Sequence, residues 1–223
     1  MDTISQTKYE KLFSTPLFRF NVDGAEALNA ELLAEGVRLR SETEGVSKSN
    51  RGGWHSAGNL FDDDAPCIQL LKSAAESAIL TATQEIGAKA DMATLGLKLF
   101  AWMNANPPGG FNAPHTHPGA HWSGVYYVAQ PDVEDGSSGK IEFLDPRNDL
   151  PNWRLLKAPA FSAKKTIRPA PGELILFPSY LVHWVYPNET NEERITIAFN
   201  ATFRKSGKPP PQGKNLSLIP NDR

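Results

Sequence analysis

The chain has 223 residues, 40% of them hydrophobic, which suffices for one large β domain or one domain with helical additions. Its net charge of −2 gives no electrostatic reason to expect nucleic acid or an anionic membrane as a partner. A single cysteine excludes an intrachain disulfide and a thiolate zinc site. Because the sequence also shows no signal-like leader and no apolar run long enough to span a membrane, we expect a cytoplasmic protein.

Residues 1–93 predict a short strand followed by two helices. The alternation over 15–22 indicates the strand. Apolar residues recur at helical spacing over much of 24–41 and 64–88, which predicts the helices. The three acids Asp62–Asp64 precede the second helix, and we interpret them as its N-terminal cap.

From residue 92 onward the hydrophobic period changes to two, which is typical of strands. Short strands are expected near 94–104, 110–116, 123–129, 139–144, 153–157, 164–168, 173–178, 181–186 and 193–203. Several short strands at this spacing favour a sandwich or barrel. We expect one globular domain, in which residues 1–93 pack on a β core of 94–204 and a proline-rich tail, 205–223, extends over the surface.

The most informative residues are three histidines in two places. His115 and His117 stand two apart in extended sequence, so both side chains point to the same face. His183 follows a buried-looking strand far downstream, and Arg194 opens the last strand. A close histidine pair, a distant third histidine and an arginine indicate a non-haem iron site beside an acid-binding pocket.

The third ligand of this site is left open by the sequence. Iron(II) oxygenases usually carry His-x-Asp or His-x-Glu, and here His117 stands in the place of the acid. Either His117 completes a three-histidine site, which also admits zinc, or a carboxylate such as Glu142 or Asp145 does so. The remaining two histidines, His55 and His121, are expected to be ordinary core or surface residues.

The last strand predicts where an acid would bind. Arg194 and Thr196 share one face, opposite the apolar residues that alternate with them. In a barrel that polar face lines the pocket, where a guanidinium holds a carboxylate through two parallel hydrogen bonds. The Tyr127 hydroxyl and the Asn200 amide are further candidates for contact with a bound acid.

These motifs resemble the iron(II)/2-oxoglutarate-dependent oxygenases related to prolyl 4-hydroxylases. The resemblance covers residues 94–203 and rests on Trp102-Met-Asn104, Asn112 to Pro118, Ser123 to Val128, Phe143 to Arg147, Pro171 to Ser179, His183 and Arg194 to Asn200. It implies a double-stranded β-helix, or jelly roll, with iron between two sheets. It also implies that His115 and His183 are ligands, that His117 stands where the family has an acid, and that Arg194 and Thr196 hold the distal carboxylate of 2-oxoglutarate.

The activity implied by the resemblance is that of a dioxygenase with Fe(II) and 2-oxoglutarate, which hydroxylates a small molecule or a protein side chain. Two alternatives stay open at this point. One is a cupin-like three-histidine enzyme that does not use 2-oxoglutarate, and the other is a non-catalytic jelly-roll binding module. A homodimer is compatible with the sequence, whereas nucleic acid and membranes are not expected partners.

Overall fold

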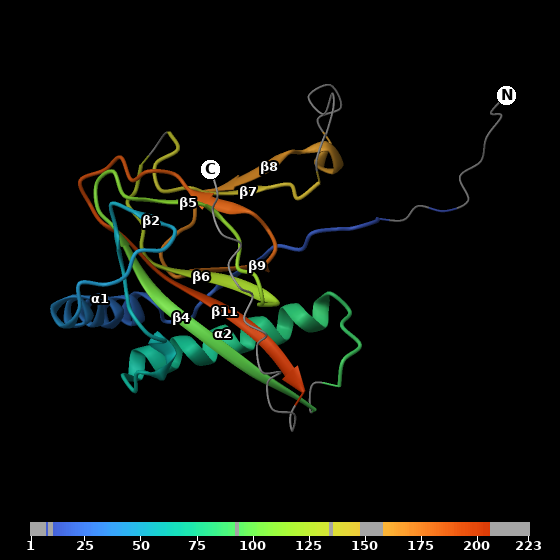
Figure 1. The fold of residues 1–223 in the computed structure, drawn as a ribbon, viewed down its shortest axis with the longest axis horizontal. Helices are drawn as coiled ribbons and strands as arrows, with labels where there is room; N and C mark the ends of the chain where they lie inside the picture. Colours follow the sequence, from blue (N-terminus) through green and yellow to red (C-terminus); the bar gives the residue numbers. More distant parts are fainter. Residues whose placement is uncertain (1–7, 9–10, 92–93, 134–135, 148–157, 206–223) are drawn as a thin grey trace, which may run out of the picture.

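The computed structural model describes residues 8, 11–91, 94–133, 136–147 and 158–205, which form two antiparallel β-sheets with helices on one side (Figure 1). The major sheet has the strand order β1-β9-β6-β11-β4-β3, and the minor sheet has the order β2-β5-β10-β7-β8. This mainly β architecture confirms the predicted jelly roll. Among the described residues no helix is long and apolar enough to cross a membrane.

The front third contains the expected strand and both expected helices. These are β1 (Phe18–Asn21), α1 (Ala25–Glu42) and α2 (Pro66–Glu85). Before α1, Gly24 adopts a φ of 68°, a conformation that costs glycine little. Between the two helices the chain also forms two short strands that the sequence does not predict, β2 (Asn50–Arg51) and β3 (Trp54–His55), followed by the 3-10 turn η1 (Leu60–Asp62).

The β core follows the predicted strands closely. Its strands are β4 (Leu95–Asn106), β5 (Phe111–His115), β6 (Trp122–Ala129), β7 (Ile141–Leu144), β8 (Lys164–Ile167), β9 (Glu173–Pro178), β10 (His183–Val185) and β11 (Arg194–Lys205), with a second 3-10 turn, η3 (Pro159–Phe161). The expected strand at 153–157 and the expected tail lie outside the described residues, apart from Lys205, which ends β11.

The acidic triplet before α2 is not a helix cap, contrary to the sequence interpretation. The capping residue is Ala65, and no side chain bonds to the first turn, which starts instead with a proline suited to that position. Asp63 accepts a hydrogen bond from the Ala65 N–H at 2.9 Å and pairs with Arg38 of α1 at 2.5 Å. This acid therefore ties the two helices together at their junction.

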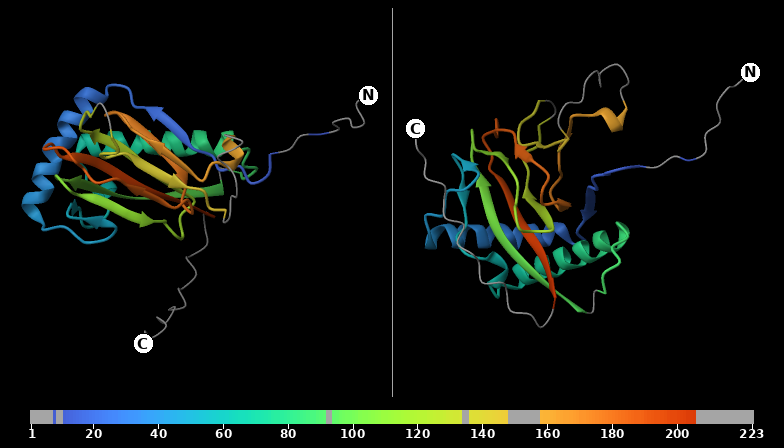
Figure 2. Two further views of the ribbon diagram at one scale, coloured as in Figure 1. Left: turned by 90° about the horizontal axis from the view of Figure 1, so that it is seen from above. Right: turned by 45° about the vertical axis from the view of Figure 1, so that its right-hand side comes forward.

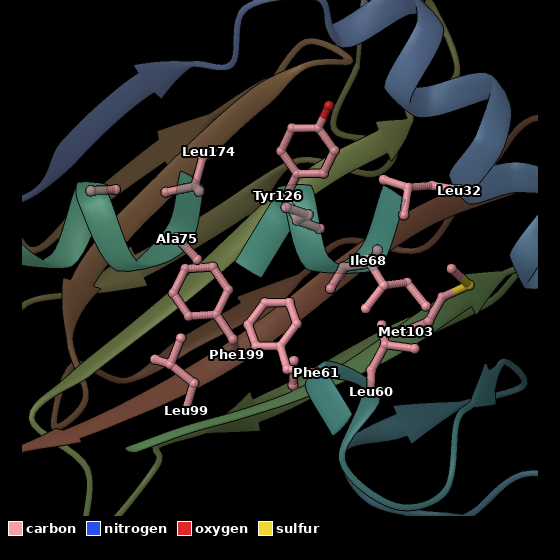
Figure 3. Close-up of a cluster of buried hydrophobic side chains, with 14 of the residues drawn as sticks. Leu32, Leu60, Phe61, Ile68, Ala75, Leu99, Met103, Tyr126, Leu174 and Phe199 are labelled. Carbon is pink, nitrogen blue, oxygen red and sulfur yellow. The ribbon is translucent and has the colours of Figure 1, made fainter. Parts of the chain in front are cut away.

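Both helices cover the outer face of the major sheet (Figure 2). The buried side chains between the helices and this sheet form the larger hydrophobic core, shown in close-up in Figure 3. It includes Leu32, Ile68, Ala75, Met103, Tyr126, Leu174 and Phe199. Two hydrogen bonds fix the layers: Tyr126 donates to Asn29 of α1 at 2.7 Å, and Trp122 donates to Thr83 of α2 at 3.0 Å. The helices therefore pack on the outer face of the major sheet, and its inner face packs against the minor sheet.

A smaller apolar cluster lies between the two sheets. Its members are Val125, Tyr127, Ile141, Phe143, Ile167, Ile175, Phe177, Leu181 and Val185. Because successive strand residues point to opposite faces, β6 contributes Tyr126 to the helix-covered core and Tyr127 to the inner cluster. The polar residues of β4, β5, β10 and β11 occupy the rest of the space between the sheets.

Candidate metal centre

The structure brings together the three histidines that the sequence singled out. His115 ends β5, His183 begins β10, and the two are directly paired across the minor sheet. His117 lies just beyond β5, and its backbone N–H donates to Ser179 at 2.9 Å. One ring nitrogen of each histidine lies within 4.8 Å of the others, a spacing at which one ion could contact all three.

Two of these rings are oriented by main-chain carbonyls. The Nδ1 of His115 lies 2.7 Å from the carbonyl of Ala113, and the Nδ1 of His183 lies 2.9 Å from that of Leu181. A carbonyl can only accept, so Nδ1 carries the proton in both rings and Nε2 keeps its lone pair. This arrangement of the second nitrogen is typical of metal-binding histidines.

Burial keeps the triad neutral, the state that a metal requires. Burial, together with the smaller effect of the neighbouring His115, lowers the pKa of His183 to about 3 and that of His117 to about 4. The pKa of His115 is lowered by the same loss of hydration. At neutral pH all three imidazoles are therefore uncharged, which is the charge state that metal binding requires.

Arg194 lies at the start of β11 and is 2% exposed. Its Nε donates to Gln130 at 3.2 Å, its Nη1 donates to Asn106 at 3.4 Å, and its guanidinium lies 5.2 Å from the centre of the Tyr127 ring. Within the described part of the chain no carboxylate forms an ion pair with it. Burial lowers its pKa from the ordinary value, as expected of a cation without a counter-ion.

One cavity joins this arginine to the histidines. It is lined by the triad, by Arg194 and Thr196, and by the neighbouring Trp102 and Asn104 of β4. No Asp or Glu lines it among the described residues. Three buried polar atoms at this arginine end have no hydrogen-bond partner in the part of the chain described: Asn104 Oδ1, Asn106 Nδ2 and the Tyr127 hydroxyl. Buried polar groups are rarely left unpaired, so these atoms fit a polar ligand beside the guanidinium.

The two carboxylates considered as alternative ligands point elsewhere. Ile141 and Phe143 face the inner cluster, so Glu142 lies on the outer face of the minor sheet, where Thr166, Trp184, Tyr186 and Lys164 contact it. Asp145 is held by Arg147 at 2.5 Å. Among the described residues, His117 alone is placed to complete a three-ligand site.

The remaining candidates are distributed as follows. Thr196 is buried on the cavity wall, two residues from Arg194. Asn200 contacts His117 rather than Arg194. His55 stacks on Trp102 at 5.5 Å and bonds to a backbone carbonyl, while His121 accepts the N–H of Phe203 at 3.2 Å, so neither joins the triad.

Sequence reasoning missed Asn106 and Gln130, both of which contact Arg194. The parity of β4 held a signal for the first, because Asn104 and Asn106 share a strand face with Trp102. Nothing in the sequence marked Gln130, which follows the end of β6.

Comparison with known proteins agrees with this geometry. Residues 100–200 match the model of the family described as "Putative 2OG-Fe(II) oxygenase". This segment is similar in sequence to that family, and the chain shares its fold with a solved prolyl-4-hydroxylase. The matched residues run from β4 to Asn200 and include all three histidines and Arg194. A search among curated proteins gave no match.

Several solved structures share the fold of this chain. A Pseudomonas putida prolyl-4-hydroxylase aligns with a TM-score of 0.61 at 18% identity, over 88% of this chain and 96% of that one. A Trichoplax adhaerens prolyl hydroxylase, solved with a hypoxia inducible factor peptide, aligns at 0.60 and 17% identity over 83% of both chains. HygX from Streptomyces hygroscopicus, solved with nickel and 2-oxoglutarate, aligns at 0.56 and 14% identity over 84% of this chain and 83% of that one.

Proposed function

We propose that this protein is an Fe(II)- and 2-oxoglutarate-dependent hydroxylase in which His115, His117 and His183 hold the metal and Arg194 binds the co-substrate. The observation that carries the proposal is the buried guanidinium without a carboxylate, in the same cavity as three neutral histidines. Burying an unpaired charge is costly, and a dicarboxylic acid that spans the cavity would neutralise it. The match of residues 100–200 to the 2OG-Fe(II) oxygenase family supports 2-oxoglutarate as this acid.

The donor set fits the group that it would hold. Imidazole suits Fe(II), and three neutral ligands leave the full charge of the ion to attract an acidic co-substrate. Arg194 would take the far carboxylate, with Thr196, the Tyr127 hydroxyl and Asn106 Nδ2 as further donors. Iron and 2-oxoglutarate, when bound, supply the oxidation of a substrate C–H bond by dioxygen.

The protein's own residues orient the metal ligands and exclude water from the site. The His115 and His183 rings are fixed by carbonyls before any metal arrives, so little reorganisation accompanies binding. Inner side chains such as Phe177 and Val125 keep water from the triad on the side of the smaller core. Trp102, Ser49 and Asn112 line another part of the cavity wall, where we place the entry of the substrate.

The substrate that we propose is a small molecule or a protein side chain. The Trichoplax neighbour was solved with a peptide and HygX with hygromycin B, so the same fold accommodates both kinds. We further propose a cytoplasmic location without nucleic-acid partners, on the grounds of the net charge of −2 and the lone, buried Cys67. Fractionation of cells that express the protein tests the location.

The decisive experiment is an anaerobic titration of the metal-free protein with Fe(II) and then with 2-oxoglutarate. We expect one Fe(II) per chain and, after 2-oxoglutarate, a weak visible charge-transfer band from the chelate. Iron binding without a band or measurable 2-oxoglutarate affinity would favour the three-histidine enzyme that works without this acid. Failure to bind any divalent metal would leave the non-catalytic binding module.

A further inference from the structure

The third histidine is oriented differently from the other two. The Nδ1 of His117 faces a side-chain amide, with the Nδ2 of Asn200 at 3.4 Å. The Oδ1 of the same amide accepts a hydrogen bond from the Ser123 hydroxyl at 2.8 Å. Asn200 and Ser123 are paired across β11 and β6, so backbone hydrogen bonding holds this chain of contacts in register.

The difference matters because an amide can both donate and accept. With its nitrogen toward the ring, as here, Asn200 donates, and the neutral ring of His117 must accept at Nδ1. The ring proton then lies on Nε2, and a protonated nitrogen cannot bind a metal. His115 and His183 have no such second state, since their partners are carbonyls.

Turning the amide over removes the conflict without losing a contact. The Ser123 hydroxyl carries one donor and two acceptor lone pairs, so it can bond to either end of the Asn200 amide. With the amide oxygen toward the ring, Nδ1 carries the proton and donates, and the lone pair of Nε2 is free. Ser123 thus stabilises both orientations.

We propose that Asn200 is the positioning residue of His117, and that its amide turns over when a metal binds, converting His117 from a non-ligand to a ligand. The inference rests on the proposed function only in taking His117 as a metal ligand. It assigns Asn200 to the metal rather than to the co-substrate. Metal binding to His115 and His183 is then completed by a rearrangement of two side chains.

Zinc affinity of the full chain provides the first test. Asn200→Leu leaves His117 without a partner and should weaken zinc binding about tenfold, the scale known for residues that orient metal ligands. Asn200→Asp can only accept, so it should bind zinc at least as tightly as the parent. A merely structural asparagine would make both variants fail alike. Thr202→Asp, which places the same charge two residues along β11, is the matched control and should not tighten binding.

Proton positions on the rings of the unmutated protein provide the second test, which does not depend on a variant folding. With ¹⁵N-labelled histidine, NMR near neutral pH should place the His117 proton on Nε2 without metal and on Nδ1 with zinc, while His115 and His183 keep theirs on Nδ1. A His117 proton on the same nitrogen in both states would overturn the turn-over of the amide. A parent that binds no zinc contradicts the metal site itself, whereas equal affinity in the parent and Asn200→Leu contradicts only the role of Asn200.

Discussion

At the scale of single residues, the site is marked by a buried charge without a counter-ion and by buried polar atoms without a hydrogen-bond partner, within the described part of the chain. Arg194 is buried without an acid, and the Tyr127 hydroxyl beside it has no hydrogen-bond partner among the described residues. Burial raises the pKa of Tyr127 to about 12, so this hydroxyl stays protonated and can donate to an anion. Since a folded chain seldom leaves such groups unsatisfied, their position side by side at the arginine end of the cavity indicates a ligand of complementary charge.

Loss of one histidine tests the metal site. His183→Ala should lower the affinity for Fe(II) or zinc at least about tenfold, because two imidazoles remain of the three that converge. Metal content after dialysis against a defined free metal concentration measures the effect. His121→Ala is the control, since His121 only accepts a backbone N–H outside the triad. Equal metal content in both variants would contradict the assignment.

Replacement of Arg194 tests the co-substrate. A shielded guanidinium–carboxylate pair contributes about 2–3 kcal/mol, so Arg194→Ala should weaken 2-oxoglutarate roughly tenfold to a hundredfold with iron bound. Arg194→Lys should recover part of the affinity, because an ammonium lacks the planar pair of donors. The control is Arg204→Ala, an exposed arginine on the same strand. An unchanged 2-oxoglutarate affinity in Arg194→Ala, measured by anaerobic titration, would exclude this role.

At the scale of elements, strand parity accounts for most of what the sequence predicted. The alternation in β11 places Ile195, Ile197 and Phe199 in the helix-covered core and turns Arg194 and Thr196 toward the cavity, as expected. The same rule applied to β7 excludes Glu142 as a ligand, because Ile141 and Phe143 flank it. Asp145 carried no such signal, since it follows the end of the strand.

Register and very short strands were beyond the sequence. The pairing of Arg194 with Asn106 and of Thr196 with Asn104 assembles the arginine end of the cavity. It depends on how two strands 88 residues apart align, which no local pattern encodes. Strands of two residues such as β2 and β3 are too short to show a hydrophobic period, so the sequence predicts neither of them.

Glu142 gives the minor sheet a pH-dependent stability. Burial alone would raise its pKa, but hydrogen bonds from Lys164, Thr166, Tyr186 and Trp184 outweigh that effect and lower it to about 2, against an ordinary 4.5. A depressed pKa stabilises the fold above pH 4.5, and this contribution disappears as the pH falls from there toward 2.

Glu142→Gln should therefore lower the free energy of unfolding by about 1–3 kcal/mol at neutral pH, because it removes the charge from these hydrogen bonds. The difference from the parent should shrink steadily below pH 4.5. Urea unfolding at a series of pH values measures it, with Glu85→Gln at the exposed end of α2 as the control. A constant difference down to pH 3 would show that Glu142 acts through packing alone.

At the scale of the whole molecule, the front third of the chain completes the β core. β1 and β3 form the two edges of the major sheet, and β2 forms one edge of the minor sheet. α1 and α2 supply more than a third of the larger core, with Leu28, Leu32, Ile68, Leu71 and Ile79 all buried in it. The sequence predicted these helices outside the barrel, and it could not show that strands from the same segment close the sheets.

We therefore expect residues 1–93 and 94–204 to unfold as one unit, although the residues that match the family model all fall in the second part. A fragment that begins at residue 94 lacks both helices and the edge strands β1 and β3. It would expose the outer face of the major sheet and leave β9 and β4 without their edge partners, which favours aggregation. Urea unfolding of the full chain should give coincident transitions by far-ultraviolet circular dichroism and by tryptophan fluorescence, because Trp122 lies between sheet and helix and Trp184 on the minor sheet. Two separate transitions, or a well-dispersed NMR spectrum from the 94–205 fragment, would show that the β core folds independently of the helices.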